Sequence, residues 1–367
     1  MSGGVDSAVA AALLAREGHE VVGATLKLWC YGGEKASARS CCSLKDIEDA
    51  RNTASRIGIK HYVLDEEADF DRDVIDPFVN SYLDGETPNP CVRCNTHLKF
   101  GGLLNRAKKM GFDAVATGHY AQISQEADGP VLRRGKDAGK DQSYVLWGLT
   151  RADLSFARFP VGSYSKDEIR TIAEEIDLNV AQKIDSQDIC FVQGGAYSDF
   201  VKQRAGDAPQ AQPGNIVDLD GVVLGRHRGV IHYTVGQRRG LGLAGDAPIY
   251  VVAIDAEQNE VIVGPESALL ETDMVLREVN WVSMAPPASP FSTHTKIRYR
   301  APGMPSLFTP KENGWAHVKF EEPQRAISPG QSAVFYRDDV VLGGAVIHSG
   351  APVVSEASPV VTHTETL

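Results

Sequence analysis

The feature that most constrains this chain is a glycine-rich string at its beginning, Ser2-Gly3-Gly4-Val5-Asp6-Ser7, which runs into an Ala/Leu-rich helical segment. Two glycines let the backbone approach an anion closely, and a helix N-terminus offers N–H groups and the positive end of its dipole. A glycine-rich turn capped by Ser or Asp is the simpler interpretation. The complete string favours a nucleotide pyrophosphate, and the missing Lys of GxxxxGK[ST] argues against a Walker-type NTPase.

Strands and helices alternate through the first half of the chain. Apolar residues keep helical spacing up to Gly18, a buried strand follows at 21–28, and a second helix and strand extend to residue 64. This order predicts a doubly wound, mostly parallel α/β sheet, with ligands at the carboxyl ends of its strands. A strand should also precede the glycine-rich string, where only Met1 stands. We therefore expect the first strand to be missing, through a start assigned too late or a truncation.

The pattern of apolar and turn-forming residues changes near Gly206. Short Val- and Ile-rich runs, separated by Gly, Pro and Asp turns, replace the longer helical segments. We therefore predict an α/β domain at 1–204, a small β-rich domain at 205–270 and a C-terminal β-barrel at 271–350. The remaining residues, 351–367, are rich in Ser, Thr, Val and Glu and are predicted to be disordered.

Composition and charge exclude several classes of protein. Hydrophobic residues make up 43% of the 367 residues, and no apolar run reaches the ~18 residues of a membrane span. No secretory signal opens the chain, so we expect a cytoplasmic protein with no membrane partner. A net charge of −11 argues against nucleic acid, but local clusters of Lys and Arg decide that question. Such clusters occur at 226–239 and at 296–300, where Lys296, Arg298, Tyr299 and Arg300 are expected on a strand.

Three of the cysteines lie in segments whose sequence suggests a chemical role. Cys91 and Cys94 are three residues apart on the proline-rich stretch Thr87–Asn95, which we expect to be a constrained loop, and Cys190 lies in Asp185–Phe191. Such thiols can be small buried apolar groups, ligands of a metal or iron–sulfur cluster, or partners in thiol redox chemistry. The cysteines alone leave these interpretations open.

The order of the motifs, however, resembles one family. The motifs are Ser2–Ser7, Thr87–Asn95 with Lys99-Phe100, Ala116–Tyr120, Lys140–Tyr144, Asp185–Phe191, Tyr233–Leu241 and Pro329–Gln331. Together, over about residues 1–348, they resemble the bacterial tRNA-specific 2-thiouridylases of the PP-loop ATP pyrophosphatase superfamily. The resemblance implies a PP-loop, HUP-like fold. It also implies ATP-dependent 2-thiolation of the wobble uridine in tRNAs for Lys, Glu and Gln.

The resemblance further implies a mechanism. ATP, used with Mg²⁺, adenylates the C2 oxygen of the uridine. A persulfide on Cys190, loaded by a relay protein or a cysteine desulfurase, then supplies the sulfur as AMP departs. Cys94 attacks Cys190 and leaves a Cys94–Cys190 disulfide, which is why two catalytic thiols are required.

Site residues are carried over from the family motifs position by position. The implied ATP-binding residues are Met1, Ser2, Gly3, Gly4, Val5, Asp6, Ser7, Leu26 and Gly118. The wall of the target-base pocket would be Asn89, Pro90 and Cys91. The tRNA contacts would be His119, Lys140, Asp141, Gln142, Arg298, Tyr299 and Gln331.

The chain departs from the family pattern at one position. Many members carry Asp where Cys91 stands, and that carboxylate is proposed to assist proton transfer, which a thiol does not do in the same way. The change raises an alternative in which Cys91, Cys94 and Cys190 hold a [4Fe–4S] cluster with one open iron. Two other functions remain open: a PP-loop ligase acting on a small metabolite, and a non-catalytic RNA-binding or iron–sulfur module. The first leaves the paired cysteines unexplained and the second leaves the ATP motifs unexplained.

Overall fold

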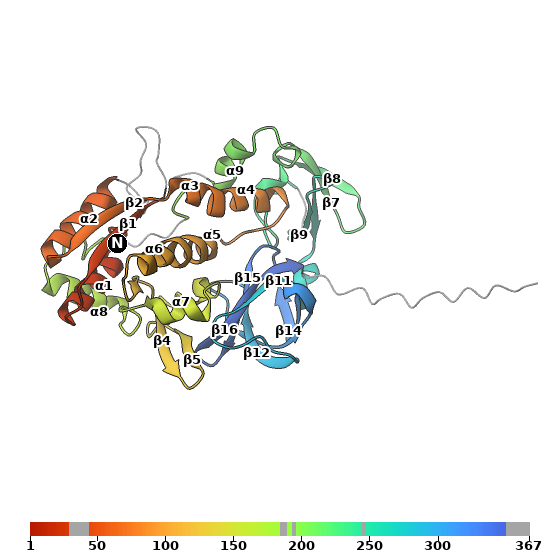
Figure 1. Ribbon diagram of the computed structural model, residues 1–367. Helices are drawn as coiled ribbons and strands as arrows, with labels where there is room; N and C mark the ends of the chain where they lie inside the picture. Colours follow the sequence, from red (N-terminus) through yellow and green to blue (C-terminus); the bar gives the residue numbers. More distant parts are fainter. Residues whose placement is uncertain (29–43, 184–188, 193–195, 244–246, 350–367) are drawn as a thin grey trace, which may run out of the picture.

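The computed structural model describes residues 1–28, 44–183, 189–192, 196–243 and 247–349 (Figure 1). The tail predicted to be disordered, 351–367, lies outside the described residues, and so do all residues between Lys183 and Ile189. Figure 1 shows an α/β part that holds the N-terminus, with a small β-sheet and a β-barrel on its other side. In the described ranges, no helix is both long enough and apolar enough to span a bilayer.

The N-terminal part packs helices on short parallel strands. β1 (Val22–Lys27) runs parallel to β2 (Lys60–Asp65), and β3 (Val115–Ala116) runs parallel to β6 (Ala157–Arg158). Helix α1 (Val5–Arg16) packs against α2 (Leu44–Ile57) and α8 (Lys166–Glu175). The predicted capping box of α8 is present, since the Ser165 hydroxyl accepts a hydrogen bond from the Glu168 N–H. The predicted α/β, mostly parallel class is confirmed.

The other elements of the N-terminal part are α3 (Glu67–Phe70), η1 (Asp71–Ile75), α4 (Asp76–Leu83), β4 (Ala121–Glu126), β5 (Gly129–Arg134), η3 (Ser143–Leu146), α7 (Arg151–Phe156) and α9 (Tyr197–Ala205).

Cys91 and Cys94 lie on a helix and not on the predicted loop. Helical turns α5 (Pro90–Arg93), η2 (Cys94–Leu103) and α6 (Leu104–Lys109) follow one another without a break, and η2 has the wider π-helical winding. Asn89 is extended and occupies the N-cap, so Pro90 takes the first helical position, where its missing N–H costs no hydrogen bond. Our prediction of a loop was therefore wrong beyond Asn89. Cys91 and Cys94 are one helical turn apart.

The central part is a small four-stranded sheet. Its strands lie in the order β8 (Val223–His227), β7 (Gly214–Val217), β10 (Glu260–Gly264), β9 (Tyr250–Asp255). Short 3₁₀ turns flank it: η4 (Pro209–Ala211), η5 (Val230–His232) and η6 (Glu266–Leu269). Ile216, Val251 and Val261 are fully buried and form its own apolar core. The predicted β-rich character of this region is confirmed.

The C-terminal part closes into a barrel. The strand order is β11 (Leu270–Trp281), β14 (Ala316–Arg325), β13 (Met304–Pro310), β12 (Phe291–Lys296), β15 (Ser332–Arg337), β16 (Val340–Ser349), and β16 pairs again with β11. A short turn, η7 (Glu312–Gly314), joins β13 to β14. The β4–β5 hairpin of the N-terminal part adds to β16, so Val341 pairs with Leu132. Because one apolar cluster joins Trp147 and Leu132 with Val334 and Val341, the two parts share a core.

One strand of the barrel ends earlier than predicted. β12 stops at Lys296, and Arg298 and Tyr299 lie on the bend and turn that follow it. The Ala301 N–H donates to the Arg298 carbonyl, and Pro302 next along the chain has no N–H for a strand ladder. The predicted alternation of basic and aromatic residues along a strand is therefore wrong from residue 297 onwards.

Candidate active site

The glycine-rich string forms a closed loop at the start of α1. The Ser2 N–H donates to Ser7 Oγ at 3.0 Å, and the Ser7 hydroxyl donates to the Gly4 carbonyl at 3.2 Å. Gly3 has φ of +71°, a left-handed conformation that favours glycine. The loop therefore presents backbone N–H groups at a helix N-terminus, the arrangement that binds phosphate. Met1 lies beside β1, where its carbonyl accepts a hydrogen bond from Thr25 Oγ1 at 2.6 Å.

Two glycines allow neighbouring backbones to reach this loop. A Cβ at Gly118 would lie 2.6 Å from the backbone N of Ser7, and a Cβ at Gly3 would lie 2.4 Å from the Asp46 carbonyl oxygen. Gly118 follows β3, so the carboxyl end of this strand meets the start of α1. The structure thus brings Gly118 to the string Ser2–Ser7, as its predicted role requires.

Asp6 is held by two neighbours. Its carboxylate accepts hydrogen bonds from Lys166 Nζ at 2.8 and 3.0 Å and from the Tyr120 hydroxyl at 2.7 Å. Lys166 is 5% exposed, so this ion pair is strongly desolvated on the lysine side. The contact fixes the first turn of α1 to α8.

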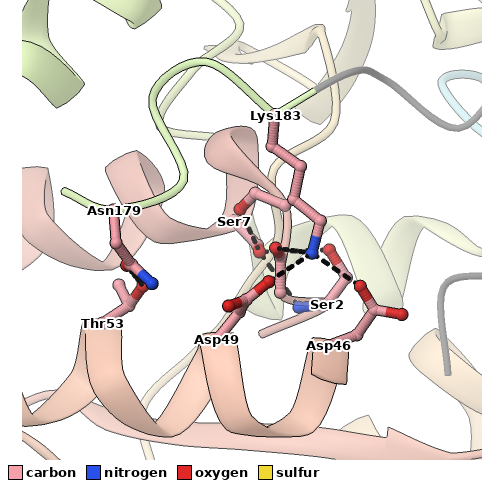
Figure 2. A network of polar contacts seen from close by, with 9 residues as sticks. Ser2, Ser7, Asp46, Asp49, Thr53, Asn179 and Lys183 are labelled. Carbon is pink, nitrogen blue, oxygen red and sulfur yellow. Dashed lines mark hydrogen bonds and ion pairs between the residues drawn. The ribbon is translucent and has the colours of Figure 1, made fainter. Parts of the chain in front are cut away.

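Lys183 joins the loop to α2 (Figure 2). Its ammonium donates to the Gly3 carbonyl at 2.9 Å and to the Asp46 and Asp49 carboxylates at 2.6 Å each. Burial alone would lower the pKa of Lys183, but its hydrogen bonds to Asp46 and Asp49 raise it above its usual value. Lys183 therefore stays charged beside the loop. The chain then continues towards Cys190, seven residues later (190 − 183).

Both predicted catalytic cysteines pack against one apolar cluster. Cys94 and Cys190 are half-buried and contact the cluster that contains Phe78, Leu98 and Phe191. Phe191 is 2% exposed and its ring meets Phe78 edge to face, with ring centroids 5.0 Å apart. Phe191 thus anchors the residue beside Cys190 in the core.

Leu26, the residue predicted to contact adenine, is part of the same arrangement. Leu26, near the end of β1, is half-buried and packs against this cluster too. Cys94 and Cys190 are far apart in the sequence, yet both pack against the same apolar cluster as Leu26. This cluster lies where β1 ends.

The segment that leads into the cysteine helix docks on the barrel. Glu86 and Arg277 form a bidentate ion pair at 2.8 and 2.7 Å, and the Gln331 side chain donates to the Thr87 carbonyl at 2.8 Å. Gly330 packs so closely that a Cβ there would lie 2.9 Å from Thr87 N. The contact of Gln331 in this structure is therefore with the chain before Asn89 and Pro90. It positions the predicted pocket wall.

Two of the segments predicted to bind tRNA contact each other through Tyr299 and Asp141. The Tyr299 hydroxyl donates to the Asp141 carbonyl at 2.9 Å, and burial first, then the charges of Asp141 and Cys91, raise the pKa of Tyr299. The Asp141 carboxylate accepts from the N–H groups of Gly135 and Ser143, and the Gln142 side chain accepts from Tyr120 N–H. Asp141 and Gln142 therefore order the loop that carries half-buried Lys140.

His119 is buried in this structure. It is 8% exposed, hydrogen-bonds Thr117 Oγ1 at 2.7 Å and packs its ring between those of Phe100 and Phe159. Burial, and secondarily the charge of Lys99, holds the pKa of His119 well below its usual range, so the ring is neutral at pH 7. Its predicted contact with tRNA stays a prediction.

Sequence reasoning missed three lysines around the nucleotide loop: Lys99, Lys166 and Lys183. Lys99 donates to Asn95 Oδ1 at 2.9 Å, and its charge lowers the pKa values of both the Met1 ammonium and His119. The proximity of Lys99 to the thiol motif was the one available signal. Nothing local in the sequence marks Lys166 or Lys183, because their partners Asp6 and Asp46 are far away in the chain.

The iron–sulfur alternative finds no support in the geometry. Within the described ranges, no group of three or more His, Cys, Asp or Glu side chains is placed to hold a metal ion. Cys91 is exposed, whereas Cys94 and Cys190 face the apolar cluster. The three thiols thus do not converge as a set of ligands.

Comparison with known proteins identifies the family. Residues 1–194 match the family described as tRNA methyl transferase HUP domain, 198–265 match its PRC-barrel domain, and 271–347 match the aminomethyltransferase beta-barrel domain. The domain limits predicted at 204 and 270 stay predictions.

Full-length relatives give the same result. The tRNA-specific 2-thiouridylase MnmA of Magnetococcus marinus is 48% identical over 349 residues, covering 95% of this chain and 97% of that protein. Those of Rhodospirillum centenum and Moorella thermoacetica are 48% and 47% identical, covering 98% and 96% of this chain and 92% and 99% of those proteins. Such identity over nearly the whole length of both chains, together with the match of residues 1–194 to the HUP-domain family, means that this chain belongs to the tRNA-specific 2-thiouridylase family.

Proposed function

We propose that this enzyme converts a uridine of tRNA into 2-thiouridine, with ATP as the activating substrate. One observation carries the proposal: Cys94, Cys190 and the adenine-side residue Leu26 pack on a single apolar cluster. A thiol pair and a nucleotide loop on one side of a sheet suit a reaction in which ATP activates an atom that sulfur then attacks.

The first chemical step is adenylation. The C2 oxygen of the uridine attacks the α-phosphorus of ATP and releases pyrophosphate, which the N–H groups of Ser2–Ser7 bind. The Lys183 ammonium, held at Gly3 and two carboxylates, keeps the loop seated on α2. Mg²⁺ accompanies ATP in this proposal and offsets phosphate charge.

The second step transfers sulfur. The outer sulfur of a Cys190 persulfide attacks C2, and the C2–O bond breaks as AMP leaves with the oxygen. Cys94 thiolate then attacks Cys190 Sγ, so the S–S bond to the transferred sulfur breaks and its electrons form the thiocarbonyl. The result is 2-thiouridine and a Cys94–Cys190 disulfide, which a thiol reductant returns to two thiols.

The proposal also specifies the tRNA substrates, the sulfur donor and the pocket that binds the base. The substrates are the tRNAs for Lys, Glu and Gln, modified at the wobble uridine, and the sulfur comes from a relay protein or a cysteine desulfurase in the cytoplasm. Asn89, Pro90 and exposed Cys91 form the wall of the base pocket, with Tyr299 beside it. A base in an anticodon loop reaches such a pocket by leaving its stack.

The test is a reconstitution with purified components. Enzyme, ATP, a sulfur donor and unmodified tRNA for Glu should give 2-thiouridine by nucleoside mass analysis, with AMP and pyrophosphate formed only when tRNA is present. AMP formation stimulated by a small metabolite, with no thiolated nucleoside, would contradict the proposal. Full activity of colourless protein without iron is also expected, and activity that requires bound iron would contradict the persulfide route.

A further inference from the structure

A buried lysine at the junction of the N-terminal part and the barrel lacks an ordinary anionic partner. Lys296 ends β12 and is 8% exposed, and its ammonium lies over the ring faces of Tyr144 and Tyr336, 5.7 and 5.8 Å from their centroids. In the part of the chain that the structure describes, no carboxylate comes within ion-pair distance of this ammonium. Burial, and next the charge of Arg134, lower the pKa of Lys296. The molecule therefore keeps a costly buried cation that is compensated by two ring faces and by the charge of Asp141, without a direct ion pair.

A second cation reaches the same rings from the other part of the molecule. Arg134 ends β5, and its guanidinium carbon lies 4.2 Å from the centroid of Tyr336. Arg134 Nε is buried and, among the described residues, makes no hydrogen bond. Lys296 and Arg134, from two elements that are distant in sequence, thus both lie over the ring of Tyr336. The Nε–H group of Arg134 is left without an acceptor among the described residues.

A third cation, Arg298, lies near the same Tyr144, close enough for the charge of each group to affect the pKa of the other. Arg298 Nε is likewise buried without a hydrogen-bond partner in the described ranges, and its Nη2 donates to the Arg325 carbonyl. The acid whose charge acts on Lys296 is Asp141, and its Oδ1 already accepts from the Gly135 and Ser143 N–H groups. We call Arg134, Lys296 and Arg298 the junction cation cluster.

Its position relates it to the base pocket. The Tyr144 ring lies beneath Lys296 on one side and contacts the ring of Tyr299 on the other, with centroids 5.9 Å apart. Tyr299 is in turn close enough to Cys91 for that thiol to affect its pKa. The cluster is thus two aromatic rings away from the wall against which the target base would lie.

We propose that the junction cation cluster binds one backbone phosphate of the RNA substrate, next to the nucleotide whose base enters the pocket. A phosphodiester carries the negative charge that the cluster lacks and oxygen acceptors for the unused Arg134 and Arg298 donors. Holding that phosphate fixes the backbone while the base is out of the stack. This inference rests on the proposed function for the identity of the RNA.

The first experiment removes the positive charge of Lys296 or of Arg134. Lys296→Met and Arg134→Gln are compared with Lys319→Met, which deletes an exposed lysine of β14 in the same barrel. Binding of unmodified tRNA is measured over a salt series. Each cluster variant should bind about tenfold more weakly, with a salt slope smaller by about one unit, while Lys319→Met should behave as wild type. Lys296→Arg should retain most of the affinity.

A single-phosphate substitution identifies the ligand. Anticodon stem-loops carrying one neutral methylphosphonate near the wobble position are bound to wild type and to Lys296→Met. One substitution should weaken binding to wild type and leave binding to Lys296→Met unaffected. Wild-type affinity and slope in Lys296→Met and Arg134→Gln, or equal losses in both proteins at every substituted phosphate, would overturn the inference. So would an effect of Lys296→Met on ATP affinity alone.

The outcomes separate this inference from the proposed function. Because the readout is RNA affinity, a protein that makes no 2-thiouridine can still show the methylphosphonate result. Conversely, a protein that thiolates tRNA with wild-type affinity after Lys296→Met keeps the proposed function and loses this inference. Melting temperatures of the three variants show whether the fold is retained, and Arg134→Gln provides the result if Lys296→Met unfolds.

Discussion

The nucleotide loop and the junction that presents the base pocket are assembled by different kinds of contact. At the loop, Ser2, Gly4 and Ser7 bond one another within six residues, so the cradle is a local structure. At the junction, Glu86 and Thr87 depend on Arg277 and Gln331, which are 191 and 244 positions away in the chain. The phosphate-binding turn thus forms from neighbouring residues, whereas the position of the base-pocket wall depends on contacts with the barrel.

The largest losses of thiolation activity are expected from changes to the two thiols, because their reaction needs both the nucleotide loop and the base pocket. Cys94→Ser and Cys190→Ser should each abolish 2-thiouridine, because one removes the attacking thiol and the other the persulfide carrier. Pyrophosphate release in the first turnover should persist, since adenylation precedes sulfur transfer. Nucleoside mass analysis with a quench-flow pyrophosphate assay checks both. Cys91→Ser should still form product, and its failure together with bound iron would contradict this account.

A steric change tests the local half of the comparison. In Gly118→Ala, the new methyl group would lie 2.6 Å from Ser7 N and displace the loop. Overpacking of about 1–3 kcal/mol corresponds to a loss of about five- to 150-fold in ATP affinity. Gly102→Ala is the matched control, because its nearest neighbour would be a carbonyl oxygen 3.6 Å away. Calorimetric titration with ATP gives both values, and equal affinities in the two variants would refute the close approach.

An ion-pair cycle tests the long-range half. Glu86 and Arg277 are 14% and 28% exposed, and Glu86→Gln or Arg277→Gln should slow thiolation several-fold and leave ATP affinity as in wild type. The double variant should lose less than the sum of the single losses, with a coupling of about 0.5–3 kcal/mol. Single-turnover thiolation measures the rates. Additive losses would mean that the pair does not position the segment before Pro90.

The smallest effect concerns pH and the start of the barrel. Burial raises the pKa of Glu271 from 4.5 to about 7. The folded protein therefore binds more protons than the unfolded chain between these values, so stability falls as pH rises from about 4.5 to 7 and then levels. Thermal melts of wild type should show this decline. Glu271→Gln should reduce it, and an unchanged pH profile would contradict the burial argument.

The sequence predicted what short-range rules determine. The PP-loop, the capping box at Ser165 and the barrel follow from glycine positions, cap residues and strand periodicity. The helix at Pro90 was missed because two prolines read as a loop, although a proline suits the first turn of a helix. Lys183 was beyond reach, since its partner Asp46 is brought near only by the fold. Lys296 was found as part of a basic cluster, but its contact with Tyr336 could not be predicted for the same reason.

The central claim is that Cys94 and Cys190 act on the same sulfur beside bound ATP. The most direct measurement loads Cys190 with ³⁵S persulfide, starts one turnover with ATP and tRNA, quenches with an alkylating agent and maps the peptides. The account predicts a Cys94–Cys190 disulfide peptide that appears at the rate and in the amount of ³⁵S-labelled 2-thiouridine. Labelled product formed while both cysteines remain alkylated as separate thiols would contradict it.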